Sequence, residues 1–251
     1  MSVVQSMRPL MIVPALNEQG SVSDVVRALR TEMPGVHVLV VDDGSTDGTG
    51  SCARSAGAFV LTLPYNLGVG GAMRAGFKYA LRHGYDAAVQ VDADGQHDPA
   101  AVKALLDGLA EADIVIGARF AGAGDYCVRG PRRWAMRLLS RTLSHVVGTT
   151  LTDATSGFRA CNRRAMSLFS RHYPVEYLGD TVEALLIAGR CGLRVAQVPV
   201  VMRQRTSGQR SAGGFRSTVY LARAALALVL GLVRSWPADL TLLDATESLP
   251  T

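Results

Sequence analysis

Short apolar runs alternate with helical patterns along the first half of the chain. Apolar runs of strand length lie at residues 10–13, 36–41, 58–63, 87–91 and 114–117. Between them, the pattern predicts helices over residues 21–30, from about 47, over 71–82, and from 98 to about 109. Alternating strands and helices are typical of a doubly wound α/β fold. We therefore predict a mostly parallel sheet with helices on both faces.

The regular alternation ends after about Asp125. Arginine-rich helical segments follow, and then come a polar loop at 152–159, a helix near 181–189 and a strand near 195–201. No internal repeat or low-complexity tract separates these elements from the first half, so we expect one domain over residues 8–215. We expect C-terminal amphipathic helices beyond it, with an apolar helix at 216–236 and a disordered tail at 237–251.

Composition and charge narrow the class of protein. A chain of 251 residues with 48% hydrophobic residues can bury one substantial core. The net charge of +5 comes almost wholly from arginine, which suits phosphate, although a coding bias toward arginine gives the same composition. The four cysteines form no CxxC pair, which fits a reducing compartment without a structural zinc. No apolar region follows a basic start at the N-terminus, so we expect no secretion signal.

Three polar motifs follow predicted strands, at the point where each strand ends. They are Pro14-Ala-Leu-Asn-Glu18, Asp42-Asp-Gly-Ser-Thr-Asp-Gly-Thr49 and Asp92-Ala-Asp-Gly-Gln-His-Asp98. The carboxyl ends of parallel strands meet at one edge of the sheet, and ligands bind there. The sequence therefore predicts that three acidic clusters converge on one ligand-binding edge.

The third cluster indicates a cation. Asp92, Asp94 and Asp98 lie within seven residues, and like charges so close together need protonation, basic partners or a bound cation. Mg²⁺ or Mn²⁺ prefers oxygen ligands and keeps some waters, and Gln96 or His97 can complete such a shell. Asp98, just before Pro99, is instead a helix cap. The alternative is that Asp92 and Asp94 merely form a turn.

The first two clusters suit a nucleotide, because a carboxylate at the end of an early strand can hold a ribose or a base edge. The glycine-rich stretch from Asn66 to Gly76 permits close approach to phosphate. Met73 stands where GxGxxG needs its third glycine, and no GxxxxGK[ST] occurs, which argues against nicotinamide enzymes and P-loop NTPases. Tight packing of a helix on a strand explains these glycines equally well.

The ordered motifs together resemble family 2 glycosyltransferases of the GT-A fold, a Rossmann-like α/β fold. The resemblance is strongest to the dolichyl-phosphate mannose synthase-like branch, which glycosylates polyprenyl phosphates. It covers roughly residues 8–215. The motifs that carry it are PxxNE at 14–18, VDDGSxDGT at 41–49, NxGxGxA at 66–72 and DADxQH at 92–97.

The resemblance implies a set of site residues. It implies that a nucleotide-sugar is bound by Pro14, Leu16, Asn17, Glu18, Asp42, Asp43, Gly70, Asp92, Ala93, Arg205 and Arg210. It also implies that Asp94 and Gln96 hold Mg²⁺ or Mn²⁺. Arg119 is expected at the donor phosphates, and Asp153 in the active site.

The acceptor determines the chemistry. A polyprenyl phosphate is already ionised near neutral pH and can attack the anomeric carbon without a general base, whereas a sugar hydroxyl needs one. Asp153 therefore has several open roles: it orients the sugar or an arginine, serves as a base for a hydroxyl acceptor, or only stabilises its loop. Where mannose synthases carry RxxGxSK, this chain reads Arg205-Thr-Ser-Gly-Gln-Arg-Ser211, so a UDP-sugar donor stays open beside GDP-mannose.

Two features suggest a membrane surface. Arg129, Arg133, Arg137 and Arg141 recur every fourth residue, which on a helix makes a basic stripe, or simply a solvated face. The apolar segment 224–233 is shorter than a spanning helix. We expect a cytoplasmic protein that is peripheral on the cytoplasmic face of the membrane, through lipid or a small membrane protein partner, and no nucleic-acid partner.

Two other enzyme classes stay open at this point, together with a non-catalytic module. A family 2 glycosyltransferase with a soluble or cell-wall hydroxyl acceptor has the same motifs. A nucleotidyltransferase that makes nucleotide-sugars shares the acids at strand ends, but should carry a glycine-rich basic loop where residues 14–18 lie. A non-catalytic binding module is not expected to keep both Asp92 and Asp94.

Overall fold

The computed structural model describes residues 7–118, 140–174 and 180–203. The predictions for Arg119, Arg205 and Arg210, for most of the basic stripe and for residues 216–251 lie outside these residues. Seven strands are present in the described part: β1 (Pro9–Ala15), β2 (His37–Asp42), β3 (Phe59–Thr62), β4 (Ala87–Gln90), β5 (Ile114–Ala118), β6 (Arg159–Asn162) and β7 (Val195–Pro199). The principal helices are α1 (Val22–Glu32), α2 (Thr49–Ser55), α3 (Gly68–Arg82), α4 (Val102–Gly108), α6 (Arg163–His172) and α7 (Asp180–Arg190).

The seven strands form one sheet in the order β3-β2-β1-β4-β6-β5-β7. The pairs β2–β3, β1–β2, β1–β4 and β5–β7 are parallel, and β6 is antiparallel to both β4 and β5. The mostly parallel α/β sheet predicted from the sequence is confirmed. Strands β1, β2, β4, β5 and β7 therefore all end at the same edge.

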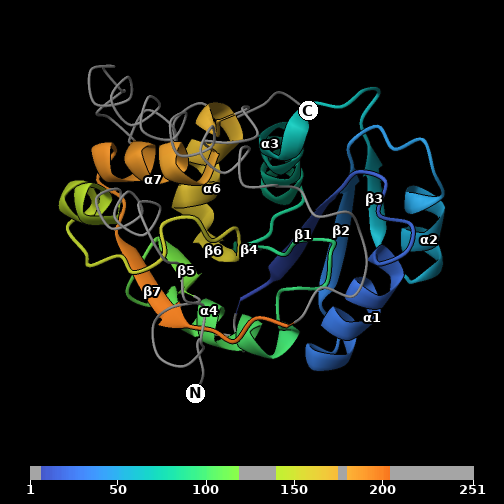
Figure 1. Ribbon diagram of the computed structural model, residues 1–251, viewed down its shortest axis with the longest axis horizontal. Helices are drawn as coiled ribbons and strands as arrows, with labels where there is room; N and C mark the ends of the chain where they lie inside the picture. Colours follow the sequence, from blue (N-terminus) through green and yellow to red (C-terminus); the bar gives the residue numbers. More distant parts are fainter. Residues whose placement is uncertain (1–6, 119–139, 175–179, 204–251) are drawn as a thin grey trace, which may run out of the picture.

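Helices cover both faces of the sheet, as predicted (Figure 1). Successive residues of a strand point to opposite faces, so each strand contributes to two cores. On one face, Leu10 and Ile12 of β1 belong to a core that includes residues of α3, α6 and α7. On the other, Met11 and Val13 belong to a core with residues of α1, α2 and α4. The strands are apolar along their length because both faces are buried.

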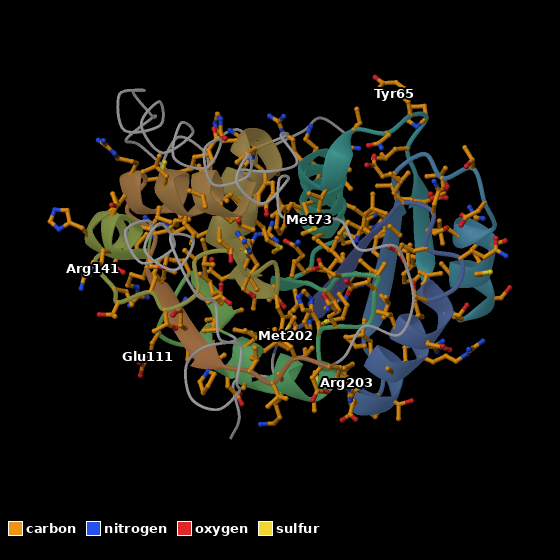
Figure 2. The ribbon with its side chains drawn as sticks, in the orientation of Figure 1. Tyr65, Met73, Glu111, Arg141, Met202 and Arg203 are labelled. Carbon is orange, nitrogen blue, oxygen red and sulfur yellow. The ribbon has the colours of Figure 1, made fainter. Side chains whose placement is uncertain are left out.

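Helix α3 lies unusually close to β1. A Cβ atom placed on Gly76 would lie 2.6 Å from Ile12 Cγ2, a distance that no real side chain tolerates. Met73, one turn earlier, is fully buried and is labelled in Figure 2. The packing role considered for the glycines of 66–76 therefore holds at Gly76. The helix also begins at Gly68, three residues before its predicted start.

Strand β6 and helix α6 were not predicted from the sequence. The residues expected to be loop at 152–159 end in Arg159, which is the first residue of β6 and is almost completely buried. Asn162 then caps α6, since its Oδ1 accepts a hydrogen bond from the N–H of Ala165 at 3.0 Å. A strand of four residues that begins with a buried arginine has no apolar run, so the pattern could not show it.

The predicted cap at Asp98 is present. Its Oδ1 accepts a hydrogen bond from the N–H of Ala100 at 3.1 Å, and Pro99 opens a short 3₁₀ turn that leads into α4. The Nη2 atom of Arg203 lies 2.8 Å from Oδ1 of the same carboxylate. Asp98 thus joins the start of α4 to the segment that follows β7.

Candidate active site

The loops that follow β1 and β2 are bonded to each other. The Oδ1 atom of Asn17 accepts the N–H of Thr46 at 2.9 Å, and the N–H of Asn17 donates to Ser45 Oγ at 3.0 Å. The N–H of Glu18 donates to Thr49 Oγ1 at 2.8 Å. Asn17 has a φ of 54°, in the left-handed region that few residues other than glycine adopt. The structure therefore brings two of the predicted motifs together in one fixed unit.

Asp42 is buried at the end of β2. Its Oδ1 accepts a hydrogen bond from the N–H of Ser45 at 3.0 Å. Its Oδ2 lies where it would be only 2.8 Å from a Cβ on Gly50, so the glycine allows the first turn of α2 to lie against the carboxylate. Asp42 is therefore held on two sides by backbone.

Asp43 is bonded to the start of α3. Its Oδ1 accepts a hydrogen bond from the N–H of Leu67 at 2.7 Å. Burial raises the pKa of the Asp43 carboxyl above its ordinary value, the backbone N–H groups of Leu67 and Gly68 oppose that shift, and the neighbouring charge of Asp42 adds to it. The turn needs Gly44, which has a φ of 76° and lies directly against the backbone at Tyr65 and Asn66.

The glycine-rich stretch is partly occupied by protein contacts. Besides the bond from Leu67 to Asp43, the N–H of Gly68 donates to Asn66 Oδ1 at 2.7 Å. Gly70, which we expected to contact the nucleotide, lies buried in the first turns of α3. Two of the N–H groups that could attract a phosphate at this helix end, those of Leu67 and Gly68, thus donate to Asp43 and Asn66.

Asp92 follows β4 and lies against the imidazole of His97. The backbone N–H of Asp92 donates to His97 Nδ1 at 3.0 Å, and His97 Nε2 lies 3.5 Å from Asp92 Oδ2. The His97 ring is buried and stacks on Phe158, with ring centroids 4.6 Å apart and an interplanar angle of 12°. Both ring nitrogens therefore face Asp92, and His97 does not complete a metal shell in the way considered from the sequence.

Asp94 and Gln96 form the turn after Asp92. The Oδ1 atom of Asp94 accepts the N–H of Gln96 at 3.0 Å, and Gly95 between them has a φ of 77°. Both side chains are partly exposed, and so is Asp92, whereas Ala93 is buried. Within the described ranges, no three His, Cys, Asp or Glu side chains gather in a way that would hold a metal. The oxygen donors at Asp94 and Gln96 fit a hard cation that takes its remaining ligands from water and substrate.

The loop of Asp153 lies against Asp92. A Cβ on Gly157 would lie 3.4 Å from Asp92 Oδ1 and 3.2 Å from Gln90 Nε2. Asp153 itself is 1% exposed, and its Oδ1 accepts hydrogen bonds from the N–H of Thr155 at 3.2 Å and from the Thr155 hydroxyl at 3.0 Å. Gln197 of β7 also contacts this loop, since its Nε2 donates a hydrogen bond to the carbonyl of Asp153 at 3.0 Å. The structure thus joins the Asp153 loop to the carboxylate edge.

Comparison with known proteins decides the family. The model of "Glycosyl transferase family 2" matches residues 11–169. The chain belongs to glycosyltransferase family 2. Two relatives are undecaprenyl-phosphate mannosyltransferase of Micrococcus luteus, 36% identical over 83% of this chain and 88% of the relative, and polyprenol monophosphomannose synthase of Mycolicibacterium smegmatis, 33% identical over 85% and 84%.

A solved structure shares the fold of this family 2 glycosyltransferase. It is glucosyl-3-phosphoglycerate synthase of Mycobacterium tuberculosis in complex with Mn²⁺, UDP and glucosyl-3-phosphoglycerate. The TM-score is 0.69 and the identity is 21%, over 92% of this chain and 82% of the other. The GT-A fold expected from the resemblance is therefore confirmed.

The sequence missed three contacts around Asp92 at this candidate site. These are His97 in its contact with Asp92, Phe158 beneath the imidazole, and Gly157 beside the carboxylate. The motif DADGQH did mark His97 as a candidate, but it offered no way to tell a metal ligand from a partner of Asp92. Phe158 and Gly157 precede β6, whose position between β4 and β5 was not foreseen.

A substitution at Asp43 tests how the edge is held. Asp43→Asn keeps an oxygen that accepts the Leu67 N–H and removes the charge that burial disfavours. Since the folded-state pKa is raised, the stability that Asp43 contributes is complete below its usual value of 3.8 and is lost as the pH rises through the raised value. We expect Asp43→Asn to be at least as stable as wild type in urea unfolding at neutral pH and to lose this advantage toward about pH 3.

Asp43→Ala is the matched control, because it removes the acceptor as well. It should lower the free energy of unfolding by about 1 kcal/mol at neutral pH, as loss of a helix cap does. Equal stabilities of the Asn and Ala variants would contradict a role for the bond to Leu67.

Proposed function

We propose that this glycosyltransferase is an inverting enzyme that moves a hexose from a nucleotide-sugar to a polyprenyl phosphate. The observation that carries the proposal is the pair of mannosyl-transferring relatives, each matched over more than four-fifths of this chain. Their names make GDP-mannose the first donor to test, with UDP-sugars as the alternative.

The donor binds along the carboxylate edge of the sheet. The fixed unit of the β1 and β2 loops, with Pro14, Leu16, Asn17, Glu18, Asp42 and Asp43, takes the nucleotide. Leu16 is 39% exposed and offers an apolar surface for the base. Asp92 and Ala93 lie at the sugar, and Gly70 lies at the start of α3. Arg119, Arg205 and Arg210 are proposed to contact the phosphates.

Asp94 and Gln96 are proposed to hold Mg²⁺ or Mn²⁺. Their oxygens suit a hard cation, and the small number of protein ligands leaves positions for the donor phosphates. When bound, the cation offsets the charge that develops on the departing nucleoside diphosphate. The turn through Gly95 fixes the spacing of the two side chains before any donor arrives.

The acceptor phosphate needs no general base. It is ionised at neutral pH, so the site has mainly to align its oxygen with the anomeric carbon. The geometry of Asp153 supports this chemistry, because the carboxylate is buried and accepts two hydrogen bonds from Thr155 of its own loop. We propose that Asp153 shapes the loop that lies against Asp92.

A membrane surface supplies the acceptor. Helical residues 140–147 place Leu143 in the core and leave Arg141 exposed, as Figure 2 shows. Arg141 is the last arginine of the predicted basic stripe and the one that the structure describes. Among the described helices, none has both the length and the apolar character needed to cross a bilayer. We propose peripheral attachment to anionic lipid on the cytoplasmic face.

The test of the function is sugar transfer in the presence and absence of metal. We expect labelled mannose from GDP-mannose, or a sugar from one of the UDP-sugars, to enter the lipid phase with a short polyprenyl phosphate, and EDTA to stop it.

Asp94→Ala should lower turnover about 100-fold or more through loss of cation binding. Glu111→Ala, which removes an exposed acid after α4, should turn over like wild type. Full turnover of Asp94→Ala would refute the metal assignment, and label appearing only on soluble acceptors would refute the lipid acceptor.

Asp153→Asn distinguishes the two acceptor chemistries. The amide oxygen of Asn can still accept the hydrogen bonds from Thr155, whereas a general base would be lost. With polyprenyl phosphate as acceptor, we expect kcat to fall less than about tenfold, against the 10²–10⁴-fold that a general base contributes. Asp153→Ala, which removes the acceptor oxygen, should be more impaired and less stable. A loss of about 10³-fold in Asp153→Asn with unchanged melting temperature would instead establish a base and a hydroxyl acceptor.

Flotation with anionic liposomes tests the membrane surface. A basic residue near an anionic bilayer contributes about 1 kcal/mol, so Arg141→Ala should weaken binding about fivefold at low salt. Arg82→Ala removes the same charge from the exposed end of α3 and should have a smaller effect. Equal effects would indicate attraction by net charge alone, and protein that stays at the bottom of the gradient would refute lipid binding.

A further inference from the structure

We infer that His97 is a positioning residue that orients the Asp92 carboxylate, and that it neither binds the metal nor acts as a base. The inference rests on the proposed function in one respect, the contact of Asp92 with the donor. Its structural content is independent of any substrate: one imidazole is bonded to the backbone of Asp92 through one nitrogen and faces the side chain of the same residue with the other.

The hydrogen bond from Asp92 fixes the tautomer of His97. The backbone N–H of Asp92 is a donor and lies 3.0 Å from Nδ1, so Nδ1 must offer its lone pair. In the neutral ring the proton is then on Nε2. Nε2 faces Asp92 Oδ2 at 3.5 Å, which gives the N–H an acceptor of opposite charge. This contact is long, as hydrogen bonds in ligand-free active sites commonly are before substrate closes them.

The surroundings hold the ring in one place. The side chain of His97 is only 3% exposed and stacks on Phe158. Phe158 itself packs against Gly117 of β5, where a Cβ would lie 3.0 Å from the Phe158 ring, and its carbonyl accepts the N–H of Gly117 at 2.8 Å. The backbone of His97 is also paired with Met202, which Figure 2 labels after β7. The imidazole therefore has little freedom to swing toward a metal.

The fixed imidazole of His97 restrains the partly exposed carboxylate of Asp92. Its side chain is 41% exposed, and beyond the imidazole it lies beside the backbone of Gly157. An exposed aspartate samples several rotamers, whereas one that faces a fixed N–H donor is held in the orientation that binds ligand. His97 thus orients Asp92 in the way that residues behind ligand-binding carboxylates commonly do, through polar contacts to the carboxylate.

The tautomer can be measured without any substrate. In ¹⁵N NMR spectra of the ligand-free protein at neutral pH, we expect the His97 ring to show its proton on Nε2 and the lone pair on Nδ1, with His97→Phe used to assign the signals. A proton on Nδ1, or a rapidly exchanging mixture, would overturn the inference. Because no transfer is involved, this result stands whether or not the proposed function does.

Kinetics test whether His97 acts through Asp92. His97→Phe keeps the stacking on Phe158 but loses both polar contacts, and should lower kcat/KM for the donor about 10–100-fold with the KM for the acceptor unchanged. His97→Gln, whose amide N–H can reach the carboxylate, should recover part of the loss. In an Asp92→Ala background, where only the bond to the backbone N–H of residue 92 remains, His97→Phe should change kcat/KM less than about twofold, because the carboxylate that His97 orients is already absent.

The control is His37→Phe. His37 also uses Nδ1 in a polar contact, at 2.8 Å from the Tyr85 hydroxyl, but it lies at the start of β2, away from the carboxylate edge. It should keep turnover within about twofold of wild type. Normal turnover of His97→Phe, or losses from His97→Phe and Asp92→Ala that multiply, would refute the positioning role. Absence of transfer in the wild type would refute the proposed function and leave the NMR result to decide on His97.

Discussion

Backbone N–H groups that donate to carboxylates are the interaction on which this active site depends. Parallel strands bring several acids to one edge of the sheet, where they repel one another. Backbone N–H groups offset this repulsion at three of the acids, which accept a bond from a nearby turn or helix start: Asp42 from Ser45, Asp43 from Leu67 and Asp94 from Gln96. A carboxylate that accepts such a bond through one oxygen is held in one orientation.

The strand directions place the ends of β5 and β7 at the same edge as the acidic motifs. Strands β5 and β7 run parallel to each other, and β6 between β4 and β5 is antiparallel to both of its neighbours, so β4, β5 and β7 all end at the same edge. Arg119 directly follows β5, and Arg205 follows β7 within a few residues. The topology thus brings the ends of β1, β2 and β4, which carry the acidic motifs, and the ends of β5 and β7 to one edge of the sheet.

The sequence predicted the parts of the fold in which buried positions are occupied by apolar residues. Strands β1, β2 and β4 are buried on both faces and therefore appear as apolar runs, and Asp98-Pro99 has the chemistry of a cap wherever it occurs. Strand β6 was missed because Arg159 is a charged residue at a buried strand position. The motifs identified the acids of the site, but not what holds them. The bond from Leu67 to Asp43 needs the left-handed turn at Gly44, and the contact of His97 with Asp92 needs Phe158 from a distant segment.

The position of β6 has a consequence for how the chain can vary in length. The chain leaves the sheet after Ala118 and returns at Arg159, and these two points are neighbours, since Ile116 pairs with Arg159 and the N–H of Gly117 donates to the carbonyl of Phe158. The end of β5 and the start of β6 are therefore adjacent in the sheet, although about 40 residues separate them in the chain. A change in the length of the connection between them costs little conformational entropy, because the cost of closing a loop rises only slowly with its length. Residues 140–158 are less free to change, because Leu143 lies in the core and Gly157 lies beside Asp92.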